Sequence, residues 1–246
     1  MCLITFSFNP GAERLLLLAA NRDEFHDRPA RPMAWWDDPA PILAGRDETA
    51  GGTWLAVSRE GRWAAVTNVR DPKARFGSRS RGLLPVEFFS GQDSPQGYAE
   101  AVQARRQEYG PFNLLMGDRE SAWYASSHAP VQAVPPGTHS LSNAALNTSW
   151  PKSDRVAARL DQFSVRSLDI DGLMNMMRDG KQAEPDTLPD TGVGQEMEQF
   201  LSSPFIVSPN YGTRCTTLIS LGEGNRMLER RFNPAGQAVG QLDYRW

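Results

Sequence analysis

The chain has 246 residues, of which 40% are apolar, and a formal net charge of −3. This length suits one layered domain over residues 1–246, and so small a net charge argues against nucleic-acid binding. The longest apolar run, residues 15–20, is far shorter than the ~20 residues that span a bilayer, and no signal-peptide pattern precedes it. We therefore expect a cytoplasmic protein with no transmembrane segment. The two cysteines have no metal-type spacing, so neither a metal site nor a disulfide framework is predicted.

The first 24 residues predict a β-hairpin. Residues 3–8 and 15–20 are apolar runs of strand length, and the turn-forming residues 9–13 separate them. Residues that pair across this hairpin are expected to have residue numbers that sum to roughly 22, which places Cys2 near Ala20. The polar tetrad of residues 21–24, which follows the second strand, then lies at the same end of the sheet.

Cys2 is the candidate nucleophile. Once Met1 is removed, Cys2 carries a thiol with a pKa near ~8.5 and an α-amine with a pKa near ~8, so the amine can accept the proton of the thiol. A neighbouring Arg22 favours the thiolate, and Asp23 can orient the amine. The alternative is that the tetrad is only the polar exit of a strand.

Four separated segments together resemble one family. They are Met-Cys-Leu-Ile with Asn21-Arg22-Asp23-Glu24, Thr67-Asn68-Val69-Arg70, Leu141-Ser142-Asn143, and Tyr211-Gly212-Thr213-Arg214. Over nearly its whole length the chain resembles the NRDE-motif family of the transport and Golgi organisation type. The resemblance implies an α+β fold, a four-layer αββα sandwich of two antiparallel sheets similar to the N-terminal-nucleophile (Ntn) hydrolases. It leaves open whether members are hydrolases or act in haem mobilisation or lipid metabolism.

Residues 25–53 are expected to form a long connection, because they contain four prolines and the pair Trp35-Trp36. The two tryptophans favour a lid or a pocket wall, and the alternative is a loop that they attach to the core. A second hairpin follows, over residues 54–58 and 62–69. If paired residues of this hairpin have residue numbers that sum to about 121, Asn68 lies opposite Thr53. It is then beside glycine backbone that a ligand can approach closely. An amide there suits an oxyanion site, as the resemblance to Ntn acylases also implies, whereas a lone asparagine is also a common strand terminator.

Residues 70–81 form a basic loop that is suited to a carboxylate or phosphate, including that of a coenzyme A-like group, or that is simply solvated. Arg70 is its first cation. The remaining pattern predicts further helices and strands. Expected helices are residues 83–90, 95–109 (capped by Ser94), 153–163, 170–178 and 195–202; expected strands are residues 112–116, 122–126, 138–143, 216–221 and 226–232. The methionines of residues 170–178 suit either a ligand groove or packing against a sheet.

Two further landmarks lie at strand ends. The resemblance assigns Asn143 to oxyanion or substrate contacts and places Arg214 against the nucleophile. Strand alternation turns Cys215 away from Arg214, so we expect it to be buried or turned from the site, and not linked to Cys2. His26, His128 and His139 are candidate haem ligands, although a lone histidine is usually an ordinary residue.

The sequence thus supports two functions. The first is an Ntn-type cysteine amidohydrolase or acyltransferase that acts on a small acyl substrate. The second is a non-catalytic carrier of haem (heme) or an acyl-CoA or other lipid, which uses the same pocket. Residues assigned to catalysis are Cys2, Arg22, Asp23, Asn68, Asn143 and Arg214; those assigned to substrate binding are Asn21, Glu24, Trp35, Trp36, Arg70 and Tyr211. No cofactor is required, haem would be a carried ligand, and the sequence specifies neither substrate nor oligomeric state.

Overall fold

A computed structural model describes residues 2–74, 77–163 and 168–246. Their contacts divide the chain into two compact units. The first comprises Met1–Asp27, Arg70–Pro72 and Pro136–Trp246, and the second comprises Arg28–Val69 and Lys73–Pro135. Each unit contains one antiparallel sheet, and each is described below by itself. The prediction of one domain over residues 1–246 stays a prediction.

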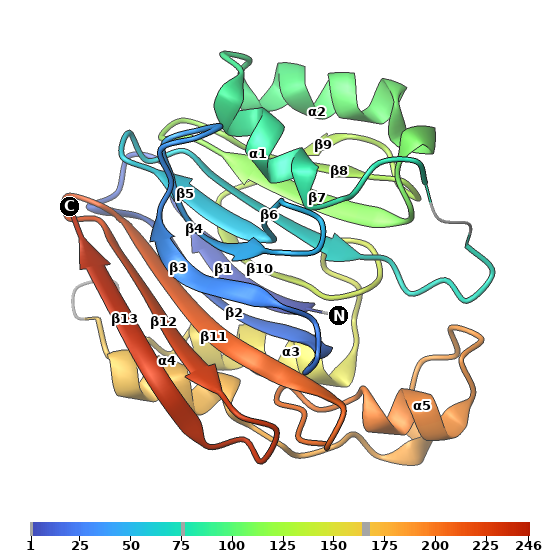
Figure 1. Ribbon diagram of the computed structural model, residues 1–246. Helices are drawn as coiled ribbons and strands as arrows, with labels where there is room; N and C mark the ends of the chain where they lie inside the picture. Colours follow the sequence, from blue (N-terminus) through green and yellow to red (C-terminus); the bar gives the residue numbers. More distant parts are fainter. Residues whose placement is uncertain (1, 75–76, 164–167) are drawn as a thin grey trace. The chain divides into compact units, whose positions relative to one another are not determined.

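The sheet of the first unit has six antiparallel strands in the order β10-β1-β2-β11-β12-β13 (Figure 1). Its two longest strands, β2 and β11, are neighbours at the centre. The bounds are β1 Cys2–Phe8, β2 Arg14–Phe25, β10 Gly137–Leu141, β11 Tyr211–Gly222, β12 Arg226–Phe232 and β13 Ala238–Arg245. The last of these strands was missed from the sequence because its alternation of exposed and half-buried residues gives no apolar run.

The register of the first hairpin differs from the prediction by two residues. Cys2 pairs with Arg22 and not with Ala20. Strand β2 also continues through the tetrad, which was expected to lie beyond the strand, because β11 supplies a partner as far as Phe25 opposite Tyr211. The four polar residues are therefore held in a regular strand, and their side chains alternate between the two faces of the sheet.

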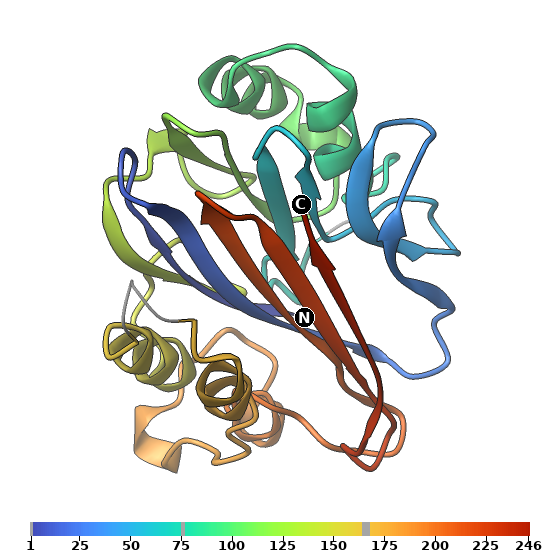
Figure 2. The same cartoon turned by 90° about the vertical axis from the view of Figure 1, so that its left-hand side faces the viewer.

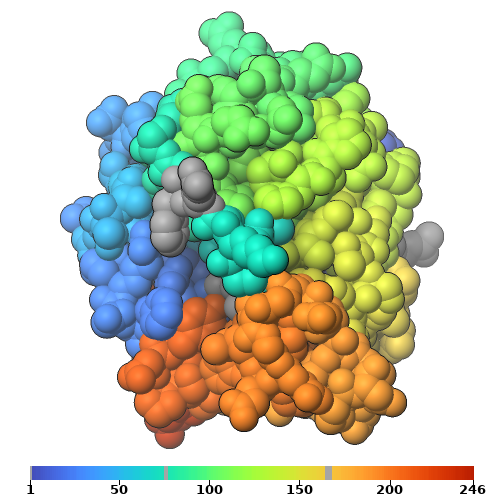
Figure 3. Space-filling view, turned by 90° about the vertical axis from the view of Figure 1, so that its right-hand side faces the viewer, coloured from blue at the N-terminus to red at the C-terminus, as the bar shows by residue number. Residues whose placement is uncertain are grey.

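Two helices cover one face of this sheet, α3 Pro151–Leu160 and α4 Ile170–Met177 (Figures 1 and 2). They pack through Val156, Leu160 and the methionines of α4 against Leu3, Leu17 and Ala19, which lie on alternate positions of β1 and β2. The methionines are thus core residues, as one of the two alternatives predicted. A short helix, α5 Gln195–Phe200, lies within the surface segment coloured orange in Figure 3.

The second unit contains a seven-stranded sheet in the order β3-β4-β5-β6-β7-β8-β9. Helices α1 Leu83–Ser90 and α2 Pro95–Ala104 pack on one of its faces, against Ala64, Val66 and Leu114. The Ser94 cap of α2 is confirmed, since its hydroxyl accepts a hydrogen bond from the Gly97 amide at 3.1 Å. Strand bounds are β3 Ala30–Trp35, β4 Ile42–Asp47, β5 Leu55–Ser58, β6 Trp63–Asn68, β7 Phe112–Gly117, β8 Ala122–Ser126 and β9 Gln132–Ala133.

The long connection predicted for residues 25–53 was wrong, because it contains β3 and β4. Pro32 is tolerated there, since β3 is an edge strand and its pairing with β4 is interrupted after Arg31. The second hairpin exists, but its pairing ends at Leu55 opposite Ala65, so Asn68 faces Phe112 of β7 and not Thr53.

The remaining helices end close to the predicted positions. The helix expected over residues 95–109 stops at Ala104 and is followed by a 3₁₀ turn, Arg106–Glu108, while part of the expected helix 153–163 lies in a turn after Leu160. In the part of the chain that the structure describes, no helix is both long and apolar enough to cross a membrane. The predicted α+β class with two antiparallel sheets is confirmed.

Candidate active site at the start of strand β1

Cys2 begins β1, between β10 and β2 in the sheet of the first unit. Cys2 is only 8% exposed, and it lies opposite Arg22 on β2. Because directly opposed residues in an antiparallel pair project from the same face of the sheet, the Cys2 thiol and the Arg22 side chain share one face. The prediction that Cys2 and Arg22 are neighbours is therefore confirmed, and the two residues pair directly with each other.

Cys215 lies opposite Arg22, in one row with Cys2 and Arg22, so of the two expected alternatives it is buried and not turned from the site. A β-bulge in β11 shifts the register between Thr213, opposite Asp23, and Cys215, opposite Arg22. The extra residue is Arg214, so simple alternation fails at this point. Cys215 is buried as predicted, and both cysteines are free. Two strand spacings separate them, about 9.5 Å, which exceeds the roughly 7 Å across which a disulfide can form.

Asp23 projects to the opposite face, toward the helices. The Thr213 hydroxyl donates a hydrogen bond to its Oδ1 at 2.7 Å, and the Tyr211 hydroxyl donates to its backbone carbonyl at 3.3 Å. Burial raises the pKa of the Asp23 carboxyl, while the Lys152 ammonium and the Thr213 hydroxyl act to lower it. Asp23 thus lies in a buried environment that contains specific groups able to stabilise its charge.

Asn21 lies on the same face and is engaged in holding the structure together. Its amide nitrogen donates to the carbonyls of Met177 at 2.7 Å and Pro204 at 2.8 Å, and its oxygen accepts from the Thr216 hydroxyl at 2.6 Å. These bonds tie β2 to β11, to the last residue of α4 and to the segment that follows α5. The amide predicted to bind substrate is therefore committed to protein partners.

Asn143 reaches the neighbourhood of Cys2 through Ser142. The Ser142 hydroxyl is 3.2 Å from both the Cys2 carbonyl and the Asn143 side-chain oxygen, with both oxygens placed to accept from it. Asn143 is 1% exposed, and its backbone carbonyl accepts from the Arg70 amide at 2.7 Å. The structure therefore brings together Cys2, Asn143 and Arg70 from three distant parts of the sequence, as the motif comparison predicted for the first two.

The Arg70 side chain is buried and ion-paired, which corrects the expectation of a solvated loop cation, while its role in substrate binding stays a prediction. Its guanidinium contacts the Glu198 carboxylate, and the two side chains are only 5% and 3% exposed. It also lies 4.7 Å from the centre of the Trp150 ring. Glu198 additionally accepts a hydrogen bond from the Thr191 amide at 2.8 Å. Arg70 thus anchors its own segment to α5.

Lys152 and Glu198 are buried charged residues that sequence reasoning missed. Lys152 is the second residue of α3 and is 2% exposed, and its ammonium donates to the Leu201 carbonyl at 3.0 Å. Burial lowers its pKa to about 8, while nearby Asp23, Cys2 and Glu198 act to raise it. One local signal was available: a lysine in the first turn of a helix lies at the positive end of the helix dipole. Glu198 offered none, since nothing in the sequence distinguishes it from Glu196, the exposed acidic residue two positions earlier in α5.

Arg214 and Glu24 lie next to the row formed by Cys2, Arg22 and Cys215 on three neighbouring strands. The Arg214 guanidinium donates to the Phe25 carbonyl at 2.7 Å, and Glu24 lies 3.9 Å from the Arg22 guanidinium. Arg214 is close enough to Arg22 for repulsion to lower its pKa, although burial is the larger cause. These charges create a cationic region on the strands next to Cys2.

Burial favours the protonated form of the Cys2 thiol. Burial raises its pKa, the Asp23 carboxylate raises it further, and the Arg22 guanidinium opposes both effects. The expected bias toward a thiolate is therefore overcome by desolvation. A nucleophile in this position needs a base that removes its proton during the attack.

Asn68, Trp35 and Trp36 lie in the second unit. Asn68 ends β6 opposite Phe112, and its oxyanion role stays a prediction. The Trp36 indole donates to the Ala44 carbonyl at 3.0 Å and packs in a cluster with Ile42. This packing matches the alternative of a segment that its tryptophans attach to the core. The Trp35 ring lies under the Arg59 guanidinium at 4.1 Å.

All three histidine rings contact protein groups. His26 Nε2 lies 3.1 Å from the Ser208 carbonyl, His128 Nδ1 lies 2.7 Å from the Ser127 hydroxyl, and His139 Nδ1 lies 3.0 Å from the Asn147 amide. Within residues 2–74, 77–163 and 168–246, no three His, Cys, Asp or Glu side chains are grouped so as to hold a metal ion.

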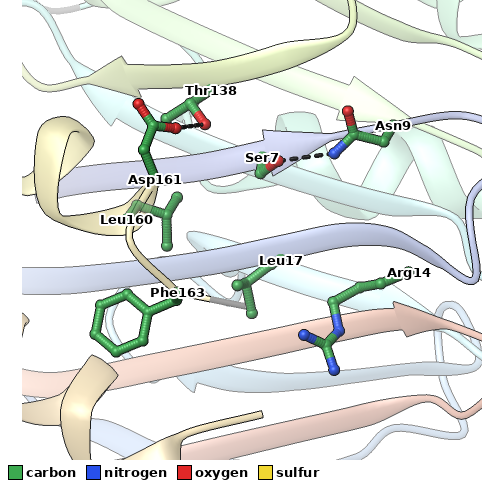
Figure 4. A pocket seen from close by; sticks show the side chains of 8 residues that line it. All are labelled: Ser7, Asn9, Arg14, Leu17, Thr138, Leu160, Asp161 and Phe163. Carbon is green, nitrogen blue, oxygen red and sulfur yellow. Dashed lines mark hydrogen bonds between the residues drawn. The ribbon is translucent and has the colours of Figure 1, made fainter. Parts of the chain in front are cut away.

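A small cavity of about 130 Å³ lies near the turn of the first hairpin (Figure 4). Asn9 donates to Ser7 across one side of it at 2.8 Å, and Thr138 contacts Asp161 on another. Ser7 is five residues from Cys2 along β1, or about 17 Å. None of the predicted site residues lines this cavity. The cavity is lined by Ser7, Asn9, Arg14, Leu17, Thr138, Leu160, Asp161 and Phe163.

The chain is similar to known proteins over most of its length. The human Transport and Golgi organization protein 2 homolog is 33% identical over 243 residues, which cover 89% of this chain and 88% of the human protein. The Drosophila melanogaster Transport and Golgi organization protein 2 is 26% identical over 257 residues, which cover 92% and 90% of the two chains.

Among solved structures, the Caenorhabditis elegans ortholog of N-acylethanolamine-hydrolyzing acid amidase matches with a TM-score of 0.50 and 7% identity, covering 88% of this chain and 92% of that one. At such low identity the match shows the fold alone, which is that of the Ntn hydrolases. The family model for Transport and Golgi organisation 2 matches residues 1–234, and the chain belongs to this family.

Proposed function

We propose that this protein is an N-terminal-nucleophile enzyme, a cysteine amidohydrolase or acyltransferase that acts on a small acyl substrate through Cys2. The observation that carries the proposal is the position of Cys2. It begins a strand, its thiol shares a face with Arg22, and Asp23 lies on the adjoining position of β2. Cys2 therefore has a cation beside its thiol and a carboxyl group at the next position of β2, groups that can act on a thiol and on an α-amine respectively.

The chemistry follows from the neutral state of the thiol. After removal of Met1, the α-amine of Cys2 takes the thiol proton as sulfur attacks the carbonyl carbon of the substrate. The tetrahedral intermediate collapses to a thioester on Cys2, and the leaving amine departs with that proton. Water, or an acceptor amine or thiol, then attacks the thioester, releases the acyl group and returns the proton to sulfur. In this scheme Asp23 orients the α-amine.

Oxyanion stabilisation is assigned to amide groups. The Asn143 side chain is buried and linked to Cys2 through the Ser142 hydroxyl. A fixed donor of this kind contributes most when the negative charge develops in a site shielded from water. The same role is proposed for Asn68. Arg22 and Arg214 provide a positive field on the strand face of Cys2, which suits a substrate that carries a carboxylate or phosphate.

The first experiment compares Cys2→Ala with Cys215→Ala, the matched cysteine two strands away. Both variants and the wild type are assayed against a panel of acyl amides and acyl thioesters, and the intact mass is recorded for covalent adducts. We expect turnover and the acyl adduct to disappear in Cys2→Ala and to persist in Cys215→Ala. Equal turnover by Cys2→Ala and the wild type would exclude Cys2 as the nucleophile.

The second experiment tests the free amine. Protein that retains Met1 is isolated by mass and is assayed before and after treatment with methionine aminopeptidase. Activity that appears only after Met1 is removed supports the α-amine as the base. Equal activity of the two forms would show that another group accepts the proton.

The same preparations distinguish the alternative function, a carrier of haem or acyl-coenzyme A. Each ligand is titrated separately against the wild type and Cys2→Ala. Saturable binding with no turnover, and equal affinity in both proteins, would favour the carrier over the enzyme. We expect instead that acyl-coenzyme A, where it reacts, leaves its acyl group on Cys2.

A further inference from the structure

Arg231 of β12 extends the row formed by Cys2, Arg22 and Cys215. Cys2 pairs with Arg22, and Arg22 pairs with Cys215. On the other side of Cys215, β12 supplies Arg231 as its partner. Because directly opposed residues of antiparallel strands project from one face of the sheet, the side chain of Arg231 lies on the same face as the Cys2 thiol. None of the steps proposed above uses this arginine.

The Arg231 guanidinium has no protein partner in the part of the chain that the structure describes. Its Nε is buried without a hydrogen-bond acceptor, and Glu229, two residues earlier on the same face, forms no ion pair with it. The preceding residue, Arg230, projects from the opposite face and donates to the Gln241 side chain at 2.9 Å. A buried donor without an acceptor destabilises a protein, and a bound ligand is one of the reasons why such a donor is retained.

Gly240 of β13 leaves the space that the Arg231 side chain occupies. Gly240 lies opposite Arg231, and a Cβ atom at this position would be only 2.4 Å from Nη2 of the guanidinium. A side chain at position 240 would therefore displace the guanidinium. The sheet thus holds a partly buried cation over the backbone of its edge strand, at a position where only glycine leaves it in place.

Two guanidiniums flank Cys215 on this face of the sheet. Arg22 and Arg231 belong to the two strands next to β11, so their Cα atoms lie about 4.8 Å to either side of that of Cys215. Burial raises the pKa of the Cys215 thiol, so no thiolate lies between the two cations. An oxyanion above Cys215 can accept hydrogen bonds from both arginines. This position is two strand spacings, about 9.5 Å, from Cys2.

We propose that Arg22 and Arg231 form an anion subsite of the Cys2 site, which binds a carboxylate or phosphate at the far end of the acyl chain of the substrate. This inference rests on the proposed function, and it names the substrate class. The substrate is a linear acyl amide or thioester whose oxyanion lies about 9.5 Å along the row from the carbonyl that Cys2 attacks. A neutral acyl chain of the same length leaves the Arg231 guanidinium without an acceptor, so the subsite discriminates between substrates by charge.

The test measures ligand binding to Cys2→Ala, a background in which the ligands are not turned over. Calorimetry compares octanedioic acid monoamide with octanamide, which has the same chain length but no terminal carboxylate. We expect Arg231→Met in this background to weaken binding of the monoamide about 10- to 100-fold, the effect of losing a charge-assisted contact, and to abolish its preference over octanamide. Arg230→Met removes the same charge from the opposite face of β12 and should leave both affinities as they are. Equal affinity for the monoamide in the Arg231→Met and Arg230→Met proteins overturns the inference.

A second variant keeps the inference testable if Arg231→Met does not fold. Gly240→Ala displaces the Arg231 guanidinium without removing its charge, and we expect it to weaken binding of the monoamide several-fold. Unchanged binding in Gly240→Ala would refute the subsite.

Turnover by protein that retains Cys2 gives a further readout. The KM for the monoamide should rise in Arg231→Met by a larger factor than kcat falls, because Arg231 contacts the far end of the substrate and not the reacting atoms. An arginine that only packs on β13 would change stability and leave KM as it is. Failure of the proposed function is recognised separately, by full turnover in Cys2→Ala, because the binding measurements require no activity.

Discussion

Replacing Arg70 by methionine should destabilise the protein by about 3–5 kcal/mol, the range for removing one partner of a buried ion pair. The side chains of Arg70 and Glu198 are only 5% and 3% exposed, so water cannot replace the lost guanidinium. The Arg70→Met variant leaves the Glu198 carboxylate in a buried site with only its Thr191 hydrogen bonds. It also removes the contact of the guanidinium with the Trp150 ring.

Urea denaturation followed by tryptophan fluorescence measures this loss, and the chain offers a matched control. Arg226 forms two hydrogen bonds with Asp243, at 2.8 and 2.7 Å, but these side chains are 22% and 30% exposed. Arg226→Met should therefore cost about 1 kcal/mol or less. Adding Glu198→Gln to Arg70→Met should recover part of the loss, because the uncompensated charge disappears. An Arg70→Met variant no less stable than Arg226→Met would refute the reasoning.

Three further changes test other parts of the structure. The pKa of Lys152 is about 8 in the folded chain and 10.5 as its reference, so the unfolded state binds more protons between these pH values. The wild type should therefore gain stability over that range by about 3 kcal/mol relative to Lys152→Met, and parallel stability curves would contradict this. Asn21→Ala leaves the carbonyls of Met177 and Pro204 without their donor, and should cost about 2–4 kcal/mol in urea denaturation; a loss below 1 kcal/mol would contradict it. Ser94→Ala removes the cap of α2 and should cost about 1 kcal/mol, measured in the same way, whereas Ser94→Gly should cost only a few tenths.

Elements with strong local signals were predictable from the sequence. Residues 83–90 form a helix with the predicted bounds, and Ser94 caps the next one. Strands 122–126 and 226–232 were also placed correctly, because turn residues bound both. Two edge strands, β3 and β13, were missed because pairing with a single neighbour leaves a weak apolar pattern. Strand β4, which lies inside its sheet, was also missed.

The predicted site was recovered in part, and the reason differs among its residues. Cys2 and Arg22 lie in one hairpin, so local pairing brings them together even when the register is two residues off. Arg70 and Lys152 are 82 positions apart, and their burial depends on long-range packing that no local pattern records. Cys215 was misplaced because a bulge, which inserts one residue opposite the partner strand, cannot be seen in an alternating pattern.

The position of the tetrad within β2 explains how four consecutive residues serve two environments. Alternation sends Arg22 to the face of the Cys2 thiol and Asp23 to the face of Lys152 and Thr213. If Met1 is removed, as proposed, Cys2 presents its thiol on one face of the sheet and its α-amine at the end of β1, between these two environments. A slip of one residue in the pairing of β1 with β2 would exchange the guanidinium for the carboxylate beside sulfur. The hydrogen bonds of the buried Asn21 amide fix β2 to β11, to the last residue of α4 and to the segment after α5. Asn21 thus holds in place the strand against which β1 pairs, and the chemistry proposed for Cys2 depends on that pairing.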